Sequence, residues 1–179
     1  MKRAPRLILI NGPAGIGKTT IAQKYITDNP LSLHASTDDI IASLGQWLAQ
    51  EDKARKLSFS LLEVMAAKHL AAGHDVVVPH LLTDAEDAVA LERIAKDQSA
   101  SFFECILIAD KEEAVKRLLE RGRWGEVGAP PLTAQDRPII EKLYEEMEIA
   151  ARDRPRAIVI HSAWNDIEGT YAQFLSALR

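Results

Sequence analysis

The sequence predicts an α/β domain in which a parallel β-sheet is covered by helices on both faces. Five short apolar runs alternate with stretches whose apolar residues recur at helical spacing, a pattern typical of right-handed βαβ crossovers. The first apolar run also meets a glycine-rich turn that leads directly into a helical pattern. The 179 residues suit one hydrophobic core, so we expect a single domain over residues 1–179.

The expected strands are the five apolar runs at residues 7–10, 31–35, 75–78, 102–109 and 157–160. The first run contains only leucine and isoleucine and is bounded by Pro5 and Gly12, which fits a strand buried on both faces. Cys105 lies inside the fourth run, so we expect it to be a buried free thiol.

Helical patterns fill the stretches between these runs. One begins at Lys18 and is ended by Asp28-Asn29-Pro30, and residues 54–72, dense in Leu, Met and Ala, predict a long helix before the third strand. Capping signals mark further helix ends, namely Thr83 with Glu86, Asp110 with Glu113, Gly73 and Gly122. Trp47 fits the apolar face of a helix and is expected in the core.

Residues 121–138, "RGRWGEVGAPPLTAQDRP", hold three glycines and three prolines between two expected helices. Structureless loops of this length are uncommon inside compact domains and are often active-site lids. We therefore expect a mobile lid at approximately 121–138.

The glycine-rich turn reads G-x-x-x-x-G-K-T between a strand and a helix, the context that a phosphate-binding loop requires. Glycines let successive backbone N–H groups face one anionic concavity at the positive end of the next helix. Lys18 would reach the β- and γ-phosphates, and the Thr19 hydroxyl would complete a Mg²⁺ sphere of phosphate oxygens and water. We expect ATP and Mg²⁺ as cofactors, with the nucleotide held by Gly12, Pro13, Ala14, Gly15, Ile16, Gly17, Lys18, Thr19 and Thr20.

Two carboxylates, Asp38 and Asp39, follow the second strand at the start of a helix. Ligands of open α/β sheets bind outside the carboxyl ends of the strands, so this position is informative. Helix capping explains one aspartate but not both. We expect Asp38 to be the general base, and Thr19, Asp38 and Asp39 to contact the metal directly or through water.

Three arginines stand near the expected lid. Arg117 and Arg121 share a helix face, and Arg123 follows at the mouth of the lid. We expect all three to contact the triphosphate and Arg121 to act in catalysis, because guanidinium groups neutralise charge that develops during phosphoryl transfer. For Arg117 an ordinary surface ion pair with Glu113 remains an equal alternative.

Weaker signals come from His80 and His161 at strand ends and from Trp124 in the expected lid. A histidine at a strand end is more often a hydrogen-bonded neighbour of a site than a catalyst. Trp124 either stacks on a base or acceptor ring or pins the lid shut. Whether His80 or Trp124 contacts substrate is left open.

Composition excludes several classes of protein. The formal charge of −4 gives no general electrostatic attraction to nucleic acid or anionic membranes, so we expect neither as a partner. No apolar run approaches the length of a membrane span, and the first is too short for a signal peptide, which predicts a cytoplasmic protein. A single cysteine supports no disulfide framework. Oligomeric state is not predicted.

The segments "GPAGIGKT", "STDDI" and "LERGR" resemble the small P-loop kinases that include chloramphenicol phosphotransferase, gluconate kinase, shikimate kinase and the polynucleotide kinase domain. The resemblance implies the P-loop NTPase fold, with a five-stranded parallel sheet in the order 2-3-1-4-5, a lid over ATP and an acceptor pocket between the second and third strands. It places Asp38 at the position of the base and Arg117 and Arg121 near the lid arginines.

One departure from these relatives matters. Many of them carry an aspartate at the end of the third strand, where this chain reads "DVVVPHLL" and has Pro79-His80. Which group anchors the water shell of the metal is therefore open, and Asp38 or Asp39 would have to help. The same departure makes His80 a candidate contact for the acceptor.

The leading hypothesis is an ATP-dependent phosphotransferase that moves the γ-phosphoryl group to a hydroxyl of a small molecule, either a metabolite or an antibiotic. One alternative is a kinase of nucleosides, nucleotides or polynucleotide 5′-hydroxyls, which "STDD" keeps open and the acidic balance opposes. Another is a P-loop ATP-binding switch module, although the chain contains neither N-K-x-D nor LSGGQ. The sequence does not identify the acceptor.

Overall fold

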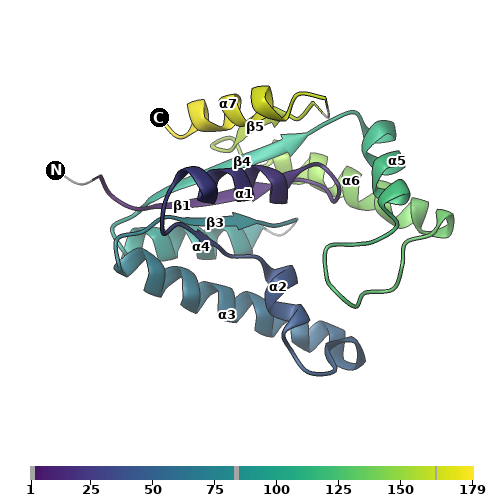
Figure 1. Cartoon of the computed structure of the whole chain (residues 1–179), viewed down its shortest axis with the longest axis horizontal. Coiled ribbons are helices and arrows are strands. Elements are labelled where there is room, and N and C mark those ends of the chain that lie inside the picture. Colours follow the sequence, from purple (N-terminus) through teal and green to yellow (C-terminus); the bar gives the residue numbers. More distant parts are fainter. Residues whose placement is uncertain (1–2, 83–84, 164) are drawn as a thin grey trace.

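The computed structural model describes residues 3–82, 85–163 and 165–179, which form a parallel sheet with helices on both faces (Figure 1). The five strands lie in the order β2-β3-β1-β4-β5 and all their pairings are parallel. They are β1 (Arg6–Asn11), β2 (Leu33–His34), β3 (Val76–Pro79), β4 (Ser101–Ile108) and β5 (Ile158–His161). This confirms both the α/β class and the order 2-3-1-4-5.

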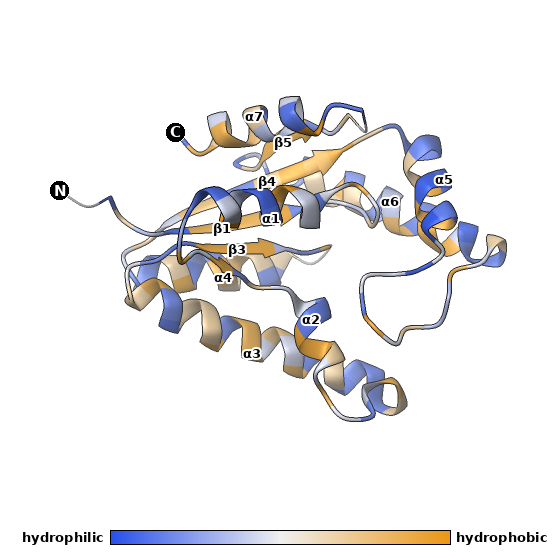
Figure 2. Ribbon diagram, viewed as in Figure 1, coloured by the Kyte–Doolittle hydropathy of each residue, from blue (hydrophilic) through white to orange (hydrophobic). Residues whose placement is uncertain are grey.

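The helices form the two outer layers. They are α1 (Lys18–Asp28), α2 (Thr37–Ala42), α3 (Glu51–Ala71), α4 (Ala85–Asp97), α5 (Lys111–Arg121), α6 (Arg137–Arg152) and α7 (Ile167–Ala177), with 3₁₀ turns η1 (Trp47–Gln50) and η2 (Ala134–Asp136). In β1, Ile8 and Ile10 face α1 and α7, whereas Leu7 and Leu9 face α3 and α4. Figure 2 shows the resulting apolar strands between the helices.

The second strand is shorter than expected. β2 covers only Leu33–His34 of the apolar run at 31–35, and it pairs with β3 alone at the edge of the sheet. Leu31 has a backbone φ of 65° and is 71% exposed, so the run begins in a turn that a branched side chain adopts rarely. Apolar content predicted this strand, but backbone pairing limits its length.

The other local expectations can be compared directly with the structure. Asp110 caps α5 by accepting a hydrogen bond from the Glu113 backbone N–H at 2.9 Å, and Gly122 ends the same helix with a φ of 67°. Cys105 and Trp47 are buried as expected, although Trp47 belongs to η1 and not to a regular α-helix. The expected cap Thr83 lies outside the described residues.

The amino end of the chain is fastened to the sheet by Asp75, which is 5% exposed. Its carboxylate accepts two hydrogen bonds from the Arg3 guanidinium at 2.8 and 2.6 Å, one from the Arg6 backbone N–H at 2.9 Å, and one from the Tyr25 hydroxyl at 2.6 Å. This network lies at the amino ends of the strands.

The carboxyl ends of the strands lie at the opposite end of the sheet, where the turns into α1 and α2 and out of α5 come together (Figure 1). The register pairs Ile10 with Pro79, and the His80 backbone N–H donates to the Ile10 carbonyl at 3.0 Å. No helix within the described residues is both long and apolar enough to cross a membrane.

Candidate functional site

The turn between β1 and α1 is curled by glycines with positive φ angles of 141° at Gly12, 81° at Gly15 and 105° at Gly17. A Cβ at Gly12 would lie 2.5 Å from the Leu107 carbonyl oxygen of β4, so only glycine fits there. The Ser162 hydroxyl donates to the Ile16 carbonyl at 3.0 Å from beyond β5. The turn is thus held against two neighbouring strands, at the amino end of α1.

The Lys18 ammonium curls back over this turn and donates to the carbonyl oxygens of Gly12 at 2.7 Å and Pro13 at 2.9 Å. Burial lowers the pKa of Lys18 to about 8, with the positive charge of Arg121 acting in the same direction and the carboxylate of Asp38 acting against it. Carbonyls offer partial charges only, so this partly buried cation is compensated better by an anion such as a phosphate.

Asp38 and Asp39 occupy the first turn of α2, and the side chain that caps this helix is Ser36. The Ser36 hydroxyl accepts from the Asp39 backbone N–H at 3.4 Å. Burial and then the nearby Glu126 raise the pKa of Asp38, while Lys18 lowers it. Asp39 is 74% exposed and its carboxylate lies 3.7 Å from His34 Nδ1. Asp38 therefore shares an environment with Lys18, whereas Asp39 faces the edge strand.

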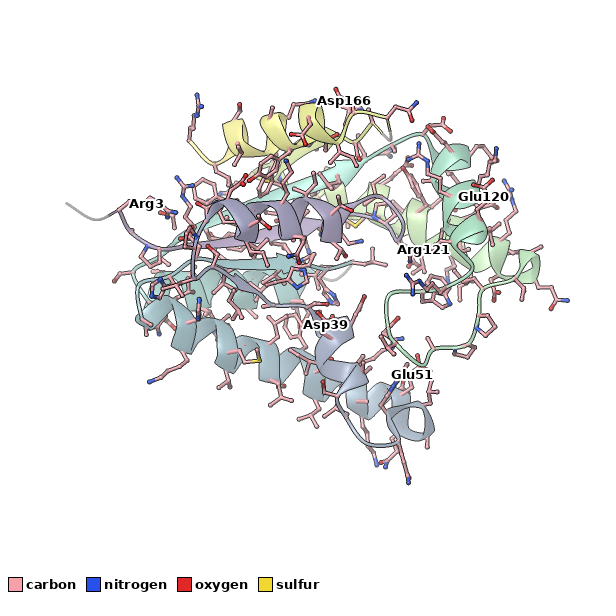
Figure 3. All side chains as sticks on the ribbon, viewed as in Figure 1. Arg3, Asp39, Glu51, Glu120, Arg121 and Asp166 are labelled. Carbon is pink, nitrogen blue, oxygen red and sulfur yellow. The ribbon has the colours of Figure 1, made fainter. Side chains whose placement is uncertain are left out.

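Of the three predicted arginines, Arg121 is the one whose charge acts on both Lys18 and Asp38. Its pKa is lowered by burial and by Arg123, and raised by Asp38. Its Nε donates to the Arg123 carbonyl at 3.0 Å. Arg117 forms an ion pair with Glu113 one turn earlier on α5. Figure 3 shows Arg121 and Asp39 at the same end of the sheet, on α5 and α2.

The expected lid at 121–138 contains an irregular part at residues 122–133, which we call the 122–133 segment, followed by η2 and α6. An isolated antiparallel bridge joins Arg123 to Pro131 across its base. Trp124 packs there against an apolar cluster that includes Leu118 and Ile140. Of the two expected roles for Trp124, the geometry matches the one in which it pins the segment.

The 122–133 segment reaches across to α2 and α3. Gly125 lies directly on Asp38, because a Cβ built on Gly125 would be 1.8 Å from Asp38 Oδ2. The Glu126 carboxylate pairs with the Arg55 guanidinium at 2.7 Å, and Ala129 packs against a cluster that contains Trp47. None of these contacts was predicted from the sequence.

At the end of β3, His80 Nδ1 lies 2.8 Å from the Thr37 hydroxyl, and its ring lies 6.1 Å from that of Phe59. Burial, Lys18 and Arg55 lower the pKa of His80 to about 4. His80 is therefore a neutral side chain at pH 7, and it lines the side of the site that β3 and α2 share.

Asn11, at the end of β1, joins the glycine turn to the loop after β3. Its Oδ1 accepts from the backbone N–H groups of Gly12 at 2.8 Å and Leu82 at 2.9 Å, and its Nδ2 donates to the Leu82 carbonyl at 3.0 Å. Its side chain is fully buried. A polar residue ending a buried strand was the only sequence signal for it.

No group of three or more His, Cys, Asp or Glu side chains in the described parts of the chain could hold a metal alone. Mg²⁺ commonly takes one or two protein oxygens and completes its sphere with phosphate oxygens and water. The exposed Thr19 and the pair Asp38 and Asp39 suit that kind of site.

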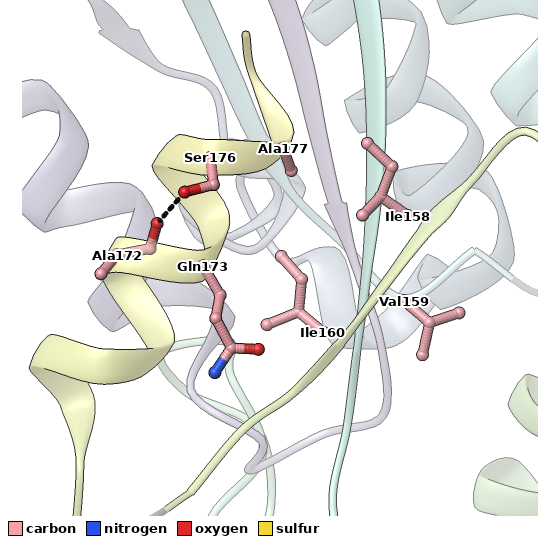
Figure 4. Close-up of a pocket in the computed structure, with 7 residues that line it drawn as sticks. All are labelled: Ile158, Val159, Ile160, Ala172, Gln173, Ser176 and Ala177. Atoms are coloured by element: carbon pink, nitrogen blue, oxygen red, sulfur yellow. Dashed lines mark hydrogen bonds between the residues drawn. The ribbon is translucent and has the colours of Figure 1, made fainter.

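A shallow hollow of about 440 Å³ lies elsewhere, between β5 and α7 (Figure 4). Its lining includes Ile158, Ile160 and Gln173 and contains no charged side chain. It is unsuited to a triphosphate, so the charged edge near Lys18 is the candidate site.

A family model described as an AAA domain matches residues 7–143. No curated protein gives a significant sequence match.

Several solved structures share the fold. The tunicamycin resistance protein of Deinococcus radiodurans is 19% identical, with a TM-score of 0.60 over 96% of each chain. A gluconokinase from Sinorhizobium meliloti 1021 is 13% identical, with a TM-score of 0.58 over 98% of this chain and 97% of that one. A chain of the Pnkp1/Rnl/Hen1 RNA repair complex is 16% identical, with a TM-score of 0.69 over 88% of this chain and 48% of that one. At these identities the likeness establishes the fold alone.

Proposed function

Because the chain belongs to the AAA domain family and shares its fold with small P-loop kinases, we propose that it is an ATP-dependent phosphotransferase. It transfers the γ-phosphoryl group of ATP to a hydroxyl of a small molecule. The observation that carries this proposal is that Lys18, Asp38 and Arg121 come together from α1, α2 and α5 at the carboxyl ends of the strands. A base, a phosphate-binding cation and a second cation are the groups that phosphoryl transfer needs.

The glycine turn and the start of α1 would hold the triphosphate of ATP. Backbone N–H groups of residues 12–18 supply hydrogen bonds, and Lys18 supplies the full charge that a phosphate attracts. Thr19, with Asp38 and Asp39, would hold Mg²⁺ directly or through water. The metal would supply charge neutralisation between the phosphates.

Asp38 would accept the proton of the attacking hydroxyl. Its raised pKa makes it a stronger base than an exposed aspartate, while Lys18 and Arg121 keep the surroundings positive. Arg121 would neutralise charge on the transferring group, and Arg117 and Arg123 would contact the phosphates from the same stretch of chain.

The test is a ³¹P NMR screen of the chain with Mg²⁺ and ATP against hydroxyl-bearing metabolites, nucleosides and antibiotics. We expect ADP and a new phosphomonoester signal with at least one acceptor, and little ADP without one. Turnover that does not depend on any acceptor would favour a nucleotide switch over a kinase. Calorimetry that detects no uptake of Mg²⁺·ATP would refute the proposal.

A polynucleotide 5′-hydroxyl is the second candidate acceptor, favoured by the fold likeness to a chain of the RNA repair complex. The charge of −4 opposes it, because strand binding normally needs a basic track. Transfer from labelled ATP to a 5′-hydroxyl oligonucleotide, with affinity that falls steeply as salt rises, would decide in favour of this acceptor.

A further inference from the structure

Arg55, one turn after the start of α3, has no role in the reaction proposed above. Its guanidinium donates to Glu51 from Nε at 3.1 Å and Nη2 at 2.8 Å, and to Glu126 from Nη1 at 2.7 Å. Its charge lowers the pKa of both Asp38 and His80. Arg55 therefore lies on the acceptor side of the site, where α2, α3 and the end of β3 meet.

Gly125 and Glu126 cover this side of the site together. The Gly125 backbone lies against the Asp38 carboxylate. The Glu126 side chain is 8% exposed, and its carboxylate pairs with the Arg55 guanidinium. The dipeptide thus spans the distance between the proposed base and a guanidinium. An acceptor hydroxyl has to reach Asp38, so the dipeptide has to leave first.

We propose that Arg55 binds an anionic group of the acceptor, and that Gly125 and Glu126 occupy the place of this acceptor in the unliganded chain. The inference rests on the proposed function and names its substrate class, a hydroxyl compound that carries a carboxylate or phosphate. The hydroxyl and the anionic group are separated by the span from the Gly125 backbone to the Glu126 carboxylate.

We expect an anionic acceptor because it would replace Glu126 as a partner of the Arg55 guanidinium. When Glu126 leaves, the Arg55 guanidinium, whose side chain is 51% exposed, loses one of its two carboxylate partners. A neutral acceptor would leave that loss uncompensated, whereas a carboxylate or phosphate would restore a charge-assisted, two-pronged contact. If the ion pair merely fastened the segment, anionic and neutral acceptors would gain equally from its removal.

The experiment uses matched probes that differ in one anionic group. Gluconate is paired with sorbitol for the carboxylate, and thymidine 3′-monophosphate with thymidine for the phosphate. Each probe is titrated by calorimetry into the full chain saturated with Mg²⁺ and AMPPNP, so that the glycine turn is already filled. The variants are Arg55→Gln and Glu126→Gln.

Matched controls come from the same kinds of position. Lys53→Gln removes a positive charge from the same end of α3, where the Lys53 ammonium donates to Gln50 Oε1 at 3.3 Å. Glu112→Gln removes an ion pair with Arg137 between α5 and α6. Neither control should change the affinity for any probe.

We expect the anionic member of at least one pair to bind about 10-fold or more tightly than its neutral partner. Arg55→Gln should weaken binding of that anion by ~10- to 100-fold and leave the neutral member unchanged. Glu126→Gln should strengthen binding of the anion several-fold, because it removes the internal competitor. The pair that responds identifies carboxylate or phosphate as the group.

Uptake of Mg²⁺·AMPPNP is measured first, so its failure would refute the proposed function separately. Normal nucleotide uptake with equal affinities for both members of each pair, including no measurable binding of either, would overturn the role of Arg55 alone. A loss in Arg55→Gln that is equal for anionic and neutral probes would overturn it as well.

Discussion

Replacing Lys18 by Met should abolish nucleotide binding and stabilise the folded chain at the same time. The Lys18 ammonium is charged at pH 7 but partly buried over the glycine turn, and its pKa is lowered to about 8. Methionine keeps most of the apolar length of the side chain and removes the charge. The site thus holds an unfavourable charge that only a phosphate would compensate fully.

The magnitude follows from that pKa. Its depression from 10.5 to about 8 corresponds to about 3 kcal/mol of unfavourable free energy in the folded chain. Methionine also loses the hydrogen bonds to the Gly12 and Pro13 carbonyls, at about 1 kcal/mol each. The net gain is about 1 kcal/mol, which raises the melting temperature by about 2–4 °C in a chain of this size.

The dependence on pH provides a second readout. Below the folded pKa of about 8 both states carry the proton, and the unfavourable term is present in full. As pH rises from 8 to 10.5 the folded chain loses the proton before the unfolded one, so the wild type gains stability relative to the variant. The advantage of Lys18→Met should therefore shrink and reverse across this window.

Thermal unfolding followed by circular dichroism at pH 7, 9 and 10 measures both effects, and calorimetry with Mg²⁺·ATP measures binding. Lys24→Met, on the same helix, removes a partly exposed ammonium that pairs with Glu168 at 2.9 Å, so this control should not stabilise the chain. A Lys18→Met variant that melts below the wild type at pH 7, or a difference that does not change with pH, would refute the reasoning. Normal ATP affinity would refute the phosphate-binding role.

Four further changes test other parts of the structure. Asp38→Asn should leave Mg²⁺·ATP affinity within about threefold and lower kcat by about 100-fold or more in a coupled assay with an active acceptor, because it removes the proposed base; an unchanged kcat would contradict that role. Gly125→Ala should lower the KM for the acceptor with little change in melting temperature, since the added Cβ would lie 1.8 Å from the movable end of Asp38 and disfavour the closed position that the acceptor displaces; an unchanged KM would show that the segment does not cover Asp38 in solution. Asn11→Ala should destabilise the fold by about 2–4 kcal/mol in urea unfolding, because three buried backbone groups lose their partner; a loss under 1 kcal/mol would contradict this. Burial alone would raise the pKa of Asp75, but the hydrogen bonds that its carboxylate accepts, chiefly from Arg3, lower it. Its contribution to the free energy of unfolding is therefore present above pH ~4 and is lost as pH falls through the folded pKa. Asp75→Asn should weaken the dependence of the free energy of unfolding on pH in that range, and an unchanged dependence would argue against this reasoning.

The fold was readable because its signals are local and repeated. Each apolar run predicts a strand, and the alternation of these runs with helical patterns predicts a parallel sheet. The order of the strands was supplied by the resemblance to P-loop kinases and is confirmed by the pairing. Strand ends were less accurate, as Leu31 shows, because a hydrogen-bonded neighbour and not apolar content decides where a strand begins.

The sequence predicted residues of the candidate site only where a motif or the end of a strand marked them. The glycine turn and Lys18 follow from spacing, and Asp38 follows from its position after a strand. Arg55 gave no signal, because four residues from Glu51 it is indistinguishable from an ordinary helical ion pair. Its other partner, Glu126, stands 71 residues away in a segment without periodicity. Such pairings arise from tertiary packing, to which spacing rules do not extend.

The end of β3 explains why the carboxylates of α2 carry so much of the proposal. His80 is neutral there, with a pKa of about 4, so among the described residues of that strand end no carboxylate stands ready to organise the water around a metal. A metal bound to Asp38 would lower its pKa and weaken it as a base. The Asp39 side chain is 74% exposed and its carboxylate lies 3.7 Å from His34 Nδ1, so it is able to turn toward the phosphates at little cost. We therefore assign the metal contact mainly to Asp39 and the proton to Asp38, a division that one carboxylate alone could not provide.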